Sequence, residues 1–342
     1  MEHIENKKRN VNIDLLKLIA CILIVGMHSI KPKLGALNYC ISIFSTVAIP
    51  CFFMVSGYLQ FGKNVITSYI IRKITKIVIV CLSWELLHSL AEFVVLGEWG
   101  GIRNILSSLI LDFIQQGLFF HFWFLGAMII LYCLLPILQK CKETNPKLFI
   151  FIFISSFALC VVINACQFIV GTAFLNSVIQ TFRIWIWIFY FILGSVIAKQ
   201  ELLIRKYFGN RHALLFALLF ASAIEVLVFH YYLCKLCIGK IWMNDAYYGS
   251  ISVITATMLM FVCILCADLH EGIERIAKFY SGLTMGIYIF HPFIFPILIK
   301  FIPLFAENQW MNLLLWLLTF GICTGISYIV SKMPILRELI KL

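Results

Sequence analysis

Residues 13–30 read IDLLKLIACILIVGMHSI, an apolar run that is long enough to cross a lipid bilayer as a single helix. Within it, Lys17 and His28 stand eleven residues apart. At about 100° per residue this spacing is three turns plus about 20°, so both side chains share one helix face, about 16 Å apart along the axis. Ionisable groups inside a span are costly and usually face a protein interior or a watery cavity. The run therefore predicts a membrane helix with a polar, functional stripe.

The rest of the 342-residue chain repeats this apolar pattern. Charged residues make up 13% of the sequence, about half the usual quarter, and apolar residues make up 62%. No alternation with a period of two is present, so the apolar runs are predicted to be helices and not barrel strands. We expect an all-α integral membrane protein, a single domain over residues 1–342 built as a polytopic bundle of about ten transmembrane helices. The predicted spans are 13–30, 39–61, 74–96, 119–139, 148–169, 181–199, 212–233, 247–267, 283–302 and 309–331.

The placement of lysine and arginine predicts the orientation of the bundle. With the N-terminus inside, 19 of the 27 basic residues fall in cytoplasmic segments, 7 fall in outer segments, and Lys17 lies within the first span. This bias predicts both termini in the cytoplasm, with residues 1–12 as an N-terminal segment and 332–342 as a C-terminal tail. The run 102–118 is predicted to be a helix at the outer surface, because polar residues interrupt it: Asp112, Gln115 and Gln116.

The net charge of +11 is mostly accounted for by this bias, so the expected partner of the basic residues is the lipid bilayer. No basic stretch is interleaved with base-stacking aromatics, and we therefore expect no nucleic-acid binding. The chain has no paired metal-ligand motif and no phosphate-binding glycine loop, so no metal site is predicted.

Five short stretches follow one another along the chain. The first runs from Arg9 through Asp14 to Ala20 and continues to His28; the others are PCFFMVSGY at 50–58, IRKITK at 71–76, HFWFL at 121–125 and GIYIFHP at 286–292. In this order they resemble the acyltransferase-3 family of bacterial integral-membrane acyltransferases. The resemblance spans nearly the whole chain, although the family usually has arginine at three positions that are lysine here: 17, 73 and 76.

Members of that family move acyl groups, usually acetyl from acetyl-CoA, onto acceptors handled at the outer membrane face. The resemblance implies an O-acetyltransferase of the bacterial cytoplasmic membrane, which moves an acetyl or other short acyl group from cytoplasmic acyl-CoA to a hydroxyl of a cell-surface glycan or related acceptor. A related branch is fused to an amino-acid racemase and credited with serine transport. A transporter of a small polar solute such as serine therefore stays open as the alternative, and a non-catalytic membrane scaffold is a third reading.

The chemistry of acyl transfer selects candidate residues. A hydroxyl that attacks a thioester must lose its proton, and a histidine of near-neutral pKa suits that task. We expect His28 to be the general base, in a catalytic set completed by Lys17, Asp14 and His291. The phosphates of CoA need cations, and the candidates for binding them at the cytoplasmic start of the third span are Arg72, Lys73 and Lys76. The predicted substrate-lining residues are Trp123, Tyr288, Glu85 and Ser56.

Structural interpretations stay open for several of these residues. Lys17 can extend to the membrane surface or pair with Asp14 three residues earlier. The basic residues at 72–76 are also typical of anchors on the inner membrane side. Ser56 and Gly57 are a small-residue pair of the kind that lets helices approach closely.

Overall fold

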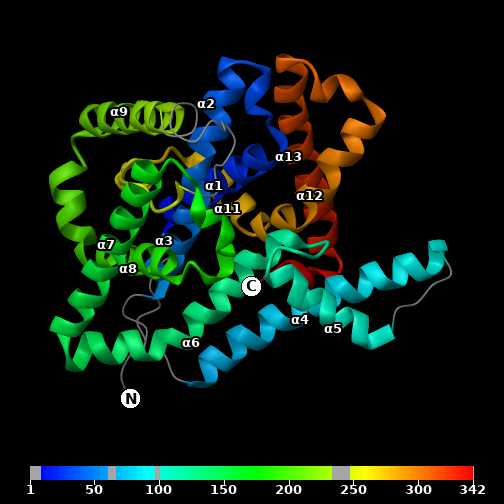
Figure 1. Ribbon diagram of the computed structural model, residues 1–342, viewed down its shortest axis with the longest axis horizontal. Helices are drawn as coiled ribbons and strands as arrows, with labels where there is room; N and C mark the ends of the chain where they lie inside the picture. Colours follow the sequence, from blue (N-terminus) through cyan, green and yellow to red (C-terminus); the bar gives the residue numbers. More distant parts are fainter. Residues whose placement is uncertain (1–8, 61–66, 97–100, 233–246, 342) are drawn as a thin grey trace.

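The computed structural model describes residues 9–60, 67–96, 101–232 and 247–341, so residues 1–8 of the predicted N-terminal segment lie outside the described part. Within these ranges the chain is helical and has no strand, as Figure 1 shows, and the expected all-α class is confirmed. The α-helices are α1 (Val11–Ser29), α2 (Ala36–Phe44), α3 (Ala48–Gln60), α4 (Thr67–Leu96), α5 (Gly101–Phe113), α6 (Trp123–Thr144), α7 (Pro146–Val170), α8 (Ile184–Phe208), α9 (His212–His230), α10 (Ile251–Leu265), α11 (Glu271–Ser281), α12 (Thr284–Phe301) and α13 (Gln309–Lys332). Short 3-10 turns join them, among them η3 (Phe120–Phe122) and η9 (Leu336–Ile340).

Nine helices in the described ranges are long and apolar enough to cross a membrane, with α2 and α3 forming one of them. They correspond to nine of the ten predicted spans. The tenth, predicted at 247–267, is α10, which has 15 residues and is shorter than the others. Its C-terminal carbonyls are held inside the bundle, because the Asn12 side chain donates to the carbonyls of Ile264 and Ala267, both at 2.7 Å.

Helix α1 lies inside the bundle and packs against α3, α10, α11, α12 and α13. It begins where the Asn10 side chain accepts a hydrogen bond from the amide of Asn12 at 3.1 Å, which satisfies one free N–H of the first turn. The central position of α1 accounts for its polar stripe: Lys17 and His28 face protein on several sides and not lipid alone.

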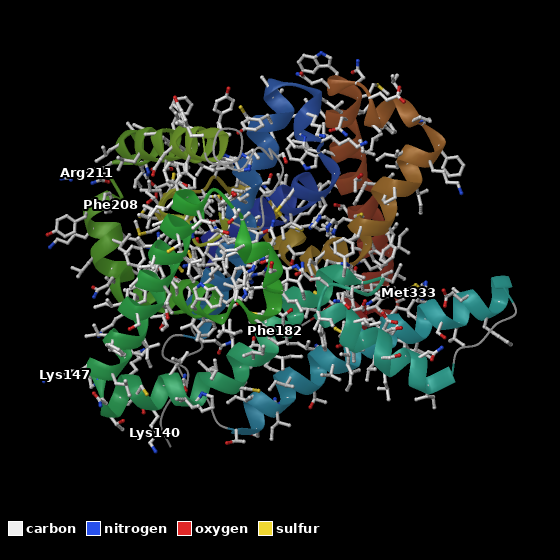
Figure 2. All side chains as sticks on the ribbon, in the orientation of Figure 1. Lys140, Lys147, Phe182, Phe208, Arg211 and Met333 are labelled. Carbon is white, nitrogen blue, oxygen red and sulfur yellow. The ribbon has the colours of Figure 1, made fainter. Side chains whose placement is uncertain are left out.

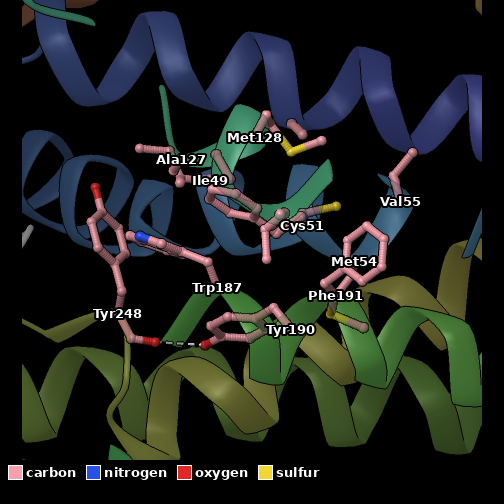
Figure 3. Packing of buried hydrophobic residues seen from close by; sticks show 14 of the residues in the cluster. Ile49, Cys51, Met54, Val55, Ala127, Met128, Trp187, Tyr190, Phe191 and Tyr248 are labelled. Carbon is pink, nitrogen blue, oxygen red and sulfur yellow. Dashed lines mark hydrogen bonds between the residues drawn. The ribbon is translucent and has the colours of Figure 1, made fainter. Parts of the chain in front are cut away.

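Helices α3 and α8 are in backbone contact. A Cβ atom added to Gly57 would lie 1.8 Å from the carbonyl oxygen of Phe191, and one added to Gly194 would lie 1.9 Å from that of Met54. Each helix thus has a glycine at the position where the backbone of the other helix leaves no room for a side chain. Around this contact, Figure 3 shows large side chains of α8, including Trp187, packed against those of α3. The contact supports the structural interpretation of Gly57.

The peripheral helices expose apolar side chains, which is expected of surfaces that face lipid. In the most apolar window, 17% of the residues of α7 and of α9 are buried, against 72% for the span formed by α2 and α3. In Figure 2 the labelled basic residues Lys140, Lys147 and Arg211 lie at the ends of helices and not along their sides. This distribution matches a multi-pass membrane protein.

Helix α5 runs back along the far part of α4, as Figure 1 shows. It covers the first part of the run predicted as a surface helix at 102–118, and a turn that contains Gln115 in a positive-φ conformation follows it. Its last turn brings Asp112 against Glu85, which lies 18 residues after the start of α4. The run therefore reaches well along α4 towards the middle of that helix.

Candidate functional site

A central cavity of about 580 Å³ lies between α1, α3, α4, α6 and α12. This volume is within the range of small-molecule sites, roughly 300–1,000 Å³. Among the described residues that line it, four are lysines and none is aspartate or glutamate; the lysines are Lys17, Lys73, Lys76 and Lys341. A cavity with this lining favours an anionic ligand.

Two lysines of α4 form the basic end of this cavity. Lys73 and Lys76 are three residues apart, so they share a helix face, and both line the cavity. Arg72 precedes Lys73 by one residue, which turns its side chain by about 100°. It is exposed and is not a lining residue. Of the three predicted phosphate-binding residues, the structure brings two together at the cavity.

Lys17, on α1, also lines the cavity, and Asp14 lies beside it. The Lys17 ammonium is 3.8 Å from the Asp14 carboxylate, which also accepts hydrogen bonds from the guanidinium of Arg9 and, at 2.6 Å, from the hydroxyl of Ser281. Asp14 is about 21 Å along α1 from His28, so it lies outside the histidine region. Its contacts suit a residue that positions Lys17 and joins α1 to the end of α11.

Ile24 and Tyr288 also line the cavity. Ile24 lies four residues before His28, which places it one turn away on nearly the same face of α1. The Tyr288 hydroxyl donates a hydrogen bond to the backbone carbonyl of His121, and its ring lies 5.0 Å from the His121 ring. Tyr288 therefore touches both the cavity and a group of histidines.

Three histidines from different elements form this group, which we call the histidine cluster. The ring centroids of His28 and His291 are 5.2 Å apart, and those of His121 and His291 are 5.8 Å apart. His121 and His291 are buried, whereas His28 is partly exposed. Within the described ranges, no three His, Cys, Asp or Glu side chains are arranged to hold a metal ion. The cluster brings together three imidazole rings, each of which can accept or donate a proton.

The position of His291 follows from the proline after it. Pro292 has no N–H, so the carbonyl of Tyr288 loses its usual helical partner. The His291 ring interacts with that carbonyl, and its Nδ1 lies 3.2 Å from the carbonyl oxygen of Ile287. Because a carbonyl only accepts, this contact assigns the proton to Nδ1. Nε2, which has no hydrogen-bond partner, is then the basic nitrogen of His291.

The structure places the other predicted lining residues in two environments. Ser56 lines the cavity, and its hydroxyl donates to the carbonyl of Phe52 at 2.9 Å. Trp123 lies in the packed core, with its ring 5.3 Å from that of Trp187, and it is not a lining residue. The neighbouring Phe124 lines the cavity in its place.

Glu85 is buried away from the cavity lining and faces Asp112. Asp112 lies outside the nine spans and accepts a hydrogen bond from the amide of Phe119 at 2.8 Å. Burial and the adjacent Glu85 carboxyl raise the pKa of Asp112, so Asp112 keeps its proton above the ordinary aspartate range. Phe119 begins the turn that carries His121, and the pair therefore supports one member of the histidine cluster.

Sequence reasoning did not select three residues that the structure brings to the site. His121 opens the HFWFL stretch, so its motif was a usable signal, but the tryptophan in that stretch was chosen instead. Asp112 was read only as a polar interruption of an apolar run. Lys341 had no signal, because nothing in the sequence shows that residues after α13 return to the cavity.

Two comparisons with known proteins find similarity over most of the chain. The family model described as an acyltransferase domain matches residues 10–332. A curated protein described as an amino-acid racemase, from Enterococcus faecalis, is 23% identical over 333 residues, which cover 90% of this chain and 44% of that protein. The chain thus spans less than half the length of this relative. No solved structure matches the chain.

Proposed function

The chain belongs to the acyltransferase-3 family and is a multi-pass membrane acyltransferase, and from this premise we propose that it transfers an acetyl or other short acyl group from acyl-CoA to a hydroxyl of a cell-surface glycan or related acceptor. The observation that carries the proposal is the continuity of the site. Tyr288 lines the lysine-rich cavity, and its ring lies 5.0 Å from that of His121 and 6.2 Å from that of His291 in the histidine cluster.

The donor end of the site is the basic end of the cavity. CoA carries several phosphate charges, and Lys73, Lys76 and Lys17 offer cations with no carboxylate in the cavity lining among the described residues. Lysine binds phosphate as a point charge, without the planar fork of the arginine usual in this family. The long, thin pantetheine arm would extend from these lysines along α1, and the acyl group would reach the histidine cluster while the nucleotide stays at the basic end.

The transfer step needs a base and a stabiliser of negative charge. The acceptor oxygen bonds to the thioester carbonyl carbon, the C–S bond breaks, and the CoA sulfur leaves. His28 or His291 takes the hydroxyl proton as the C–O bond forms and returns it to the departing sulfur. His121, whose ring nitrogens have no hydrogen-bond partner in the described structure, is available to donate to the carbonyl oxygen as it gains charge.

The acceptor would approach from the side of the cluster where His28 is partly exposed. With the basic end of the cavity in the cytoplasm, as the distribution of lysine and arginine predicts, the cluster faces the outer half of the bacterial cytoplasmic membrane. The acyl group would then cross most of the bilayer by the length of the donor, and CoA would stay inside.

Transport of a small polar solute such as serine is the competing proposal, favoured by the likeness to a protein described as an amino-acid racemase. A zwitterion needs a carboxylate or carbonyl group for its ammonium as well as a cation for its carboxylate. The described cavity lining offers lysines and no acidic side chain, which favours a polyanionic ligand.

The test uses the purified protein in lipid nanodiscs and proteoliposomes. We expect CoA to bind, and radiolabelled acetyl-CoA to lose its acetyl group to a glycan acceptor or, slowly, to water. Lys73→Gln should weaken CoA binding, whereas the neighbouring exposed Arg72→Gln serves as the matched control and should not. Uptake of labelled serine with no binding of CoA would overturn the proposal in favour of transport.

A further inference from the structure

The chain beyond α13 folds back onto the cavity, although it lies outside the residues that the family model matches. We call residues 336–341, which are η9 and Lys341, the cap segment. In Figure 1 the end of the ribbon lies beside α4, and η9 contacts α4, α12 and α13. The segment contributes two lining residues to the cavity, Ile340 and Lys341.

Two contacts hold the cap segment in place. The indole N–H of Trp84 on α4 donates to the carbonyl of Leu339 at 3.1 Å. Ile340 is 1% exposed, and its side chain packs close to Gly286 on α12. Together they hold the segment so that its last residue, Lys341, lines the cavity.

The cap segment also carries a carboxylate that pairs with a lysine of the basic end. Glu338 lies 3.7 Å from the ammonium of Lys76, a lining residue, and both side chains are partly exposed. Exposed ion pairs of this kind are weak and exchange readily with other ions. Glu338 is thus a replaceable counter-ion on one of the lysines that face the ligand.

We propose that the cap segment is part of the donor-binding site, in which a donor phosphate displaces Glu338 from Lys76 and is also held by Lys341. This inference rests on the proposed function, because it takes acyl-CoA as the ligand. The exchange replaces one carboxylate by a phosphate of higher charge and leaves the Lys76 ammonium paired throughout. It makes donor affinity depend on a segment outside the matched family domain.

The experiment measures CoA affinity by calorimetry on the full chain in nanodiscs. Glu338→Gln removes the competitor and should tighten CoA binding by up to about fivefold, the range set by one exposed ion pair. Lys341→Gln should weaken it by a similar factor. Both differences should shrink at high salt, because the contacts are near solvent.

Matched controls separate local contact from net charge. Glu274→Gln removes a carboxylate that lies 2.7 Å from the ammonium of Lys278; neither residue lines the cavity. Lys332→Gln removes a cation that also does not line the cavity. Both should leave CoA affinity unchanged. Equal affinities for Glu338→Gln, Lys341→Gln and their controls, alongside weakened binding in Lys73→Gln, would overturn the role of the cap segment and leave the proposed function standing.

Hydrogen exchange on the unmodified protein gives a second readout that does not depend on any variant. CoA should slow amide exchange in residues 336–341, and unchanged exchange at saturating CoA would also overturn the inference. A protein that is folded but does not bind CoA at all would instead refute the proposed function.

Discussion

The two candidate bases of the proposed reaction are histidines with different surroundings. His291 is buried, with Nδ1 directed at a carbonyl and Nε2 without a hydrogen-bond partner, whereas His28 is partly exposed. Replacing the histidine that acts as base by alanine should lower acyl transfer by about two to four orders of magnitude, the usual contribution of a positioned acid–base group. CoA affinity should not change, because neither ring lines the cavity.

The measurement is the initial rate of acetyl transfer by His28→Ala and His291→Ala at saturating acetyl-CoA. His88→Ala is the control, because His88 does not belong to the cluster. His88 is partly exposed, and its Nε2 lies 3.8 Å from the Glu92 carboxylate. Near-normal transfer in both cluster variants, in folded protein that still binds CoA, would rule out the histidine mechanism.

Several residues chosen from a motif or a helix face lie close together in the structure. His28, Lys17, Tyr288 and His291 lie along the cavity or in the cluster, which the spacing on α1 and the late GIYIFHP stretch both indicated. Whether these residues act as predicted stays a prediction. Within IRKITK and HFWFL, the sequence did not distinguish the residues that line the cavity from those that do not. The face that each helix turns inward depends on the neighbouring helices.

Among the elements, the contact between α3 and α8 is the most sensitive to added volume. Gly57→Ala would place a methyl group 1.8 Å from a backbone oxygen, so the two helices must separate. We expect a loss of about 1–3 kcal/mol of stability, as for other overpacked cores, seen as a lower unfolding temperature in detergent or nanodiscs. Gly321→Ala on α13 is the control, since nothing lies within 4 Å of the added atom. A Gly57→Ala protein as stable as this control would contradict the close contact.

The turn between α5 and α6 depends on the carboxyl pair of Asp112 and Glu85. Asp112→Ala leaves the amide of Phe119 without its acceptor and should cost about 1–3 kcal/mol, whereas Asp112→Asn keeps an acceptor in place. Because the folded-state pKa of Asp112 is raised, the stability that its protonated form contributes is present at low pH and is lost as the pH rises above the ordinary aspartate range.

Unfolding temperatures measured across pH test this arrangement. Wild-type protein should lose stability relative to Asp112→Asn as the pH rises, because asparagine does not titrate. Parallel curves for the two proteins would show that Asp112 is not held in its protonated form.

For the whole molecule, the orientation in the membrane stays a prediction with a direct test. Reporter fusions after Gly35, Asn145 and Asn308 sample the connections between α1 and α2, α6 and α7, and α12 and α13. A phosphatase should be active at the first and third positions, and a fluorescent protein should fold at the second. The opposite pattern would put the basic end of the cavity outside, where no acyl-CoA is available.

The helical class and nine long spans were predictable because apolar composition and span length are local properties of the sequence. The short length of α10 and the return of α5 along α4 were not predictable, because both depend on contacts with residues distant in the sequence. Asn12 caps the end of α10, and Glu85 meets Asp112 on α5. A bundle interior tolerates such helices, since neighbouring helices satisfy the polar groups that lipid would leave exposed.

The two walls of the cavity differ in how easily they deform. The α3 wall, which includes Ser56, is in close backbone contact with α8 at Gly57 and Gly194, so α3 cannot shift without disturbing that packing. The α12 wall carries Pro292 and Pro296, which remove two backbone hydrogen bonds from its second half. Bending at this hinge is the less costly way to widen the passage at Tyr288, so each catalytic cycle should be accompanied by motion of α12 against a stationary α3.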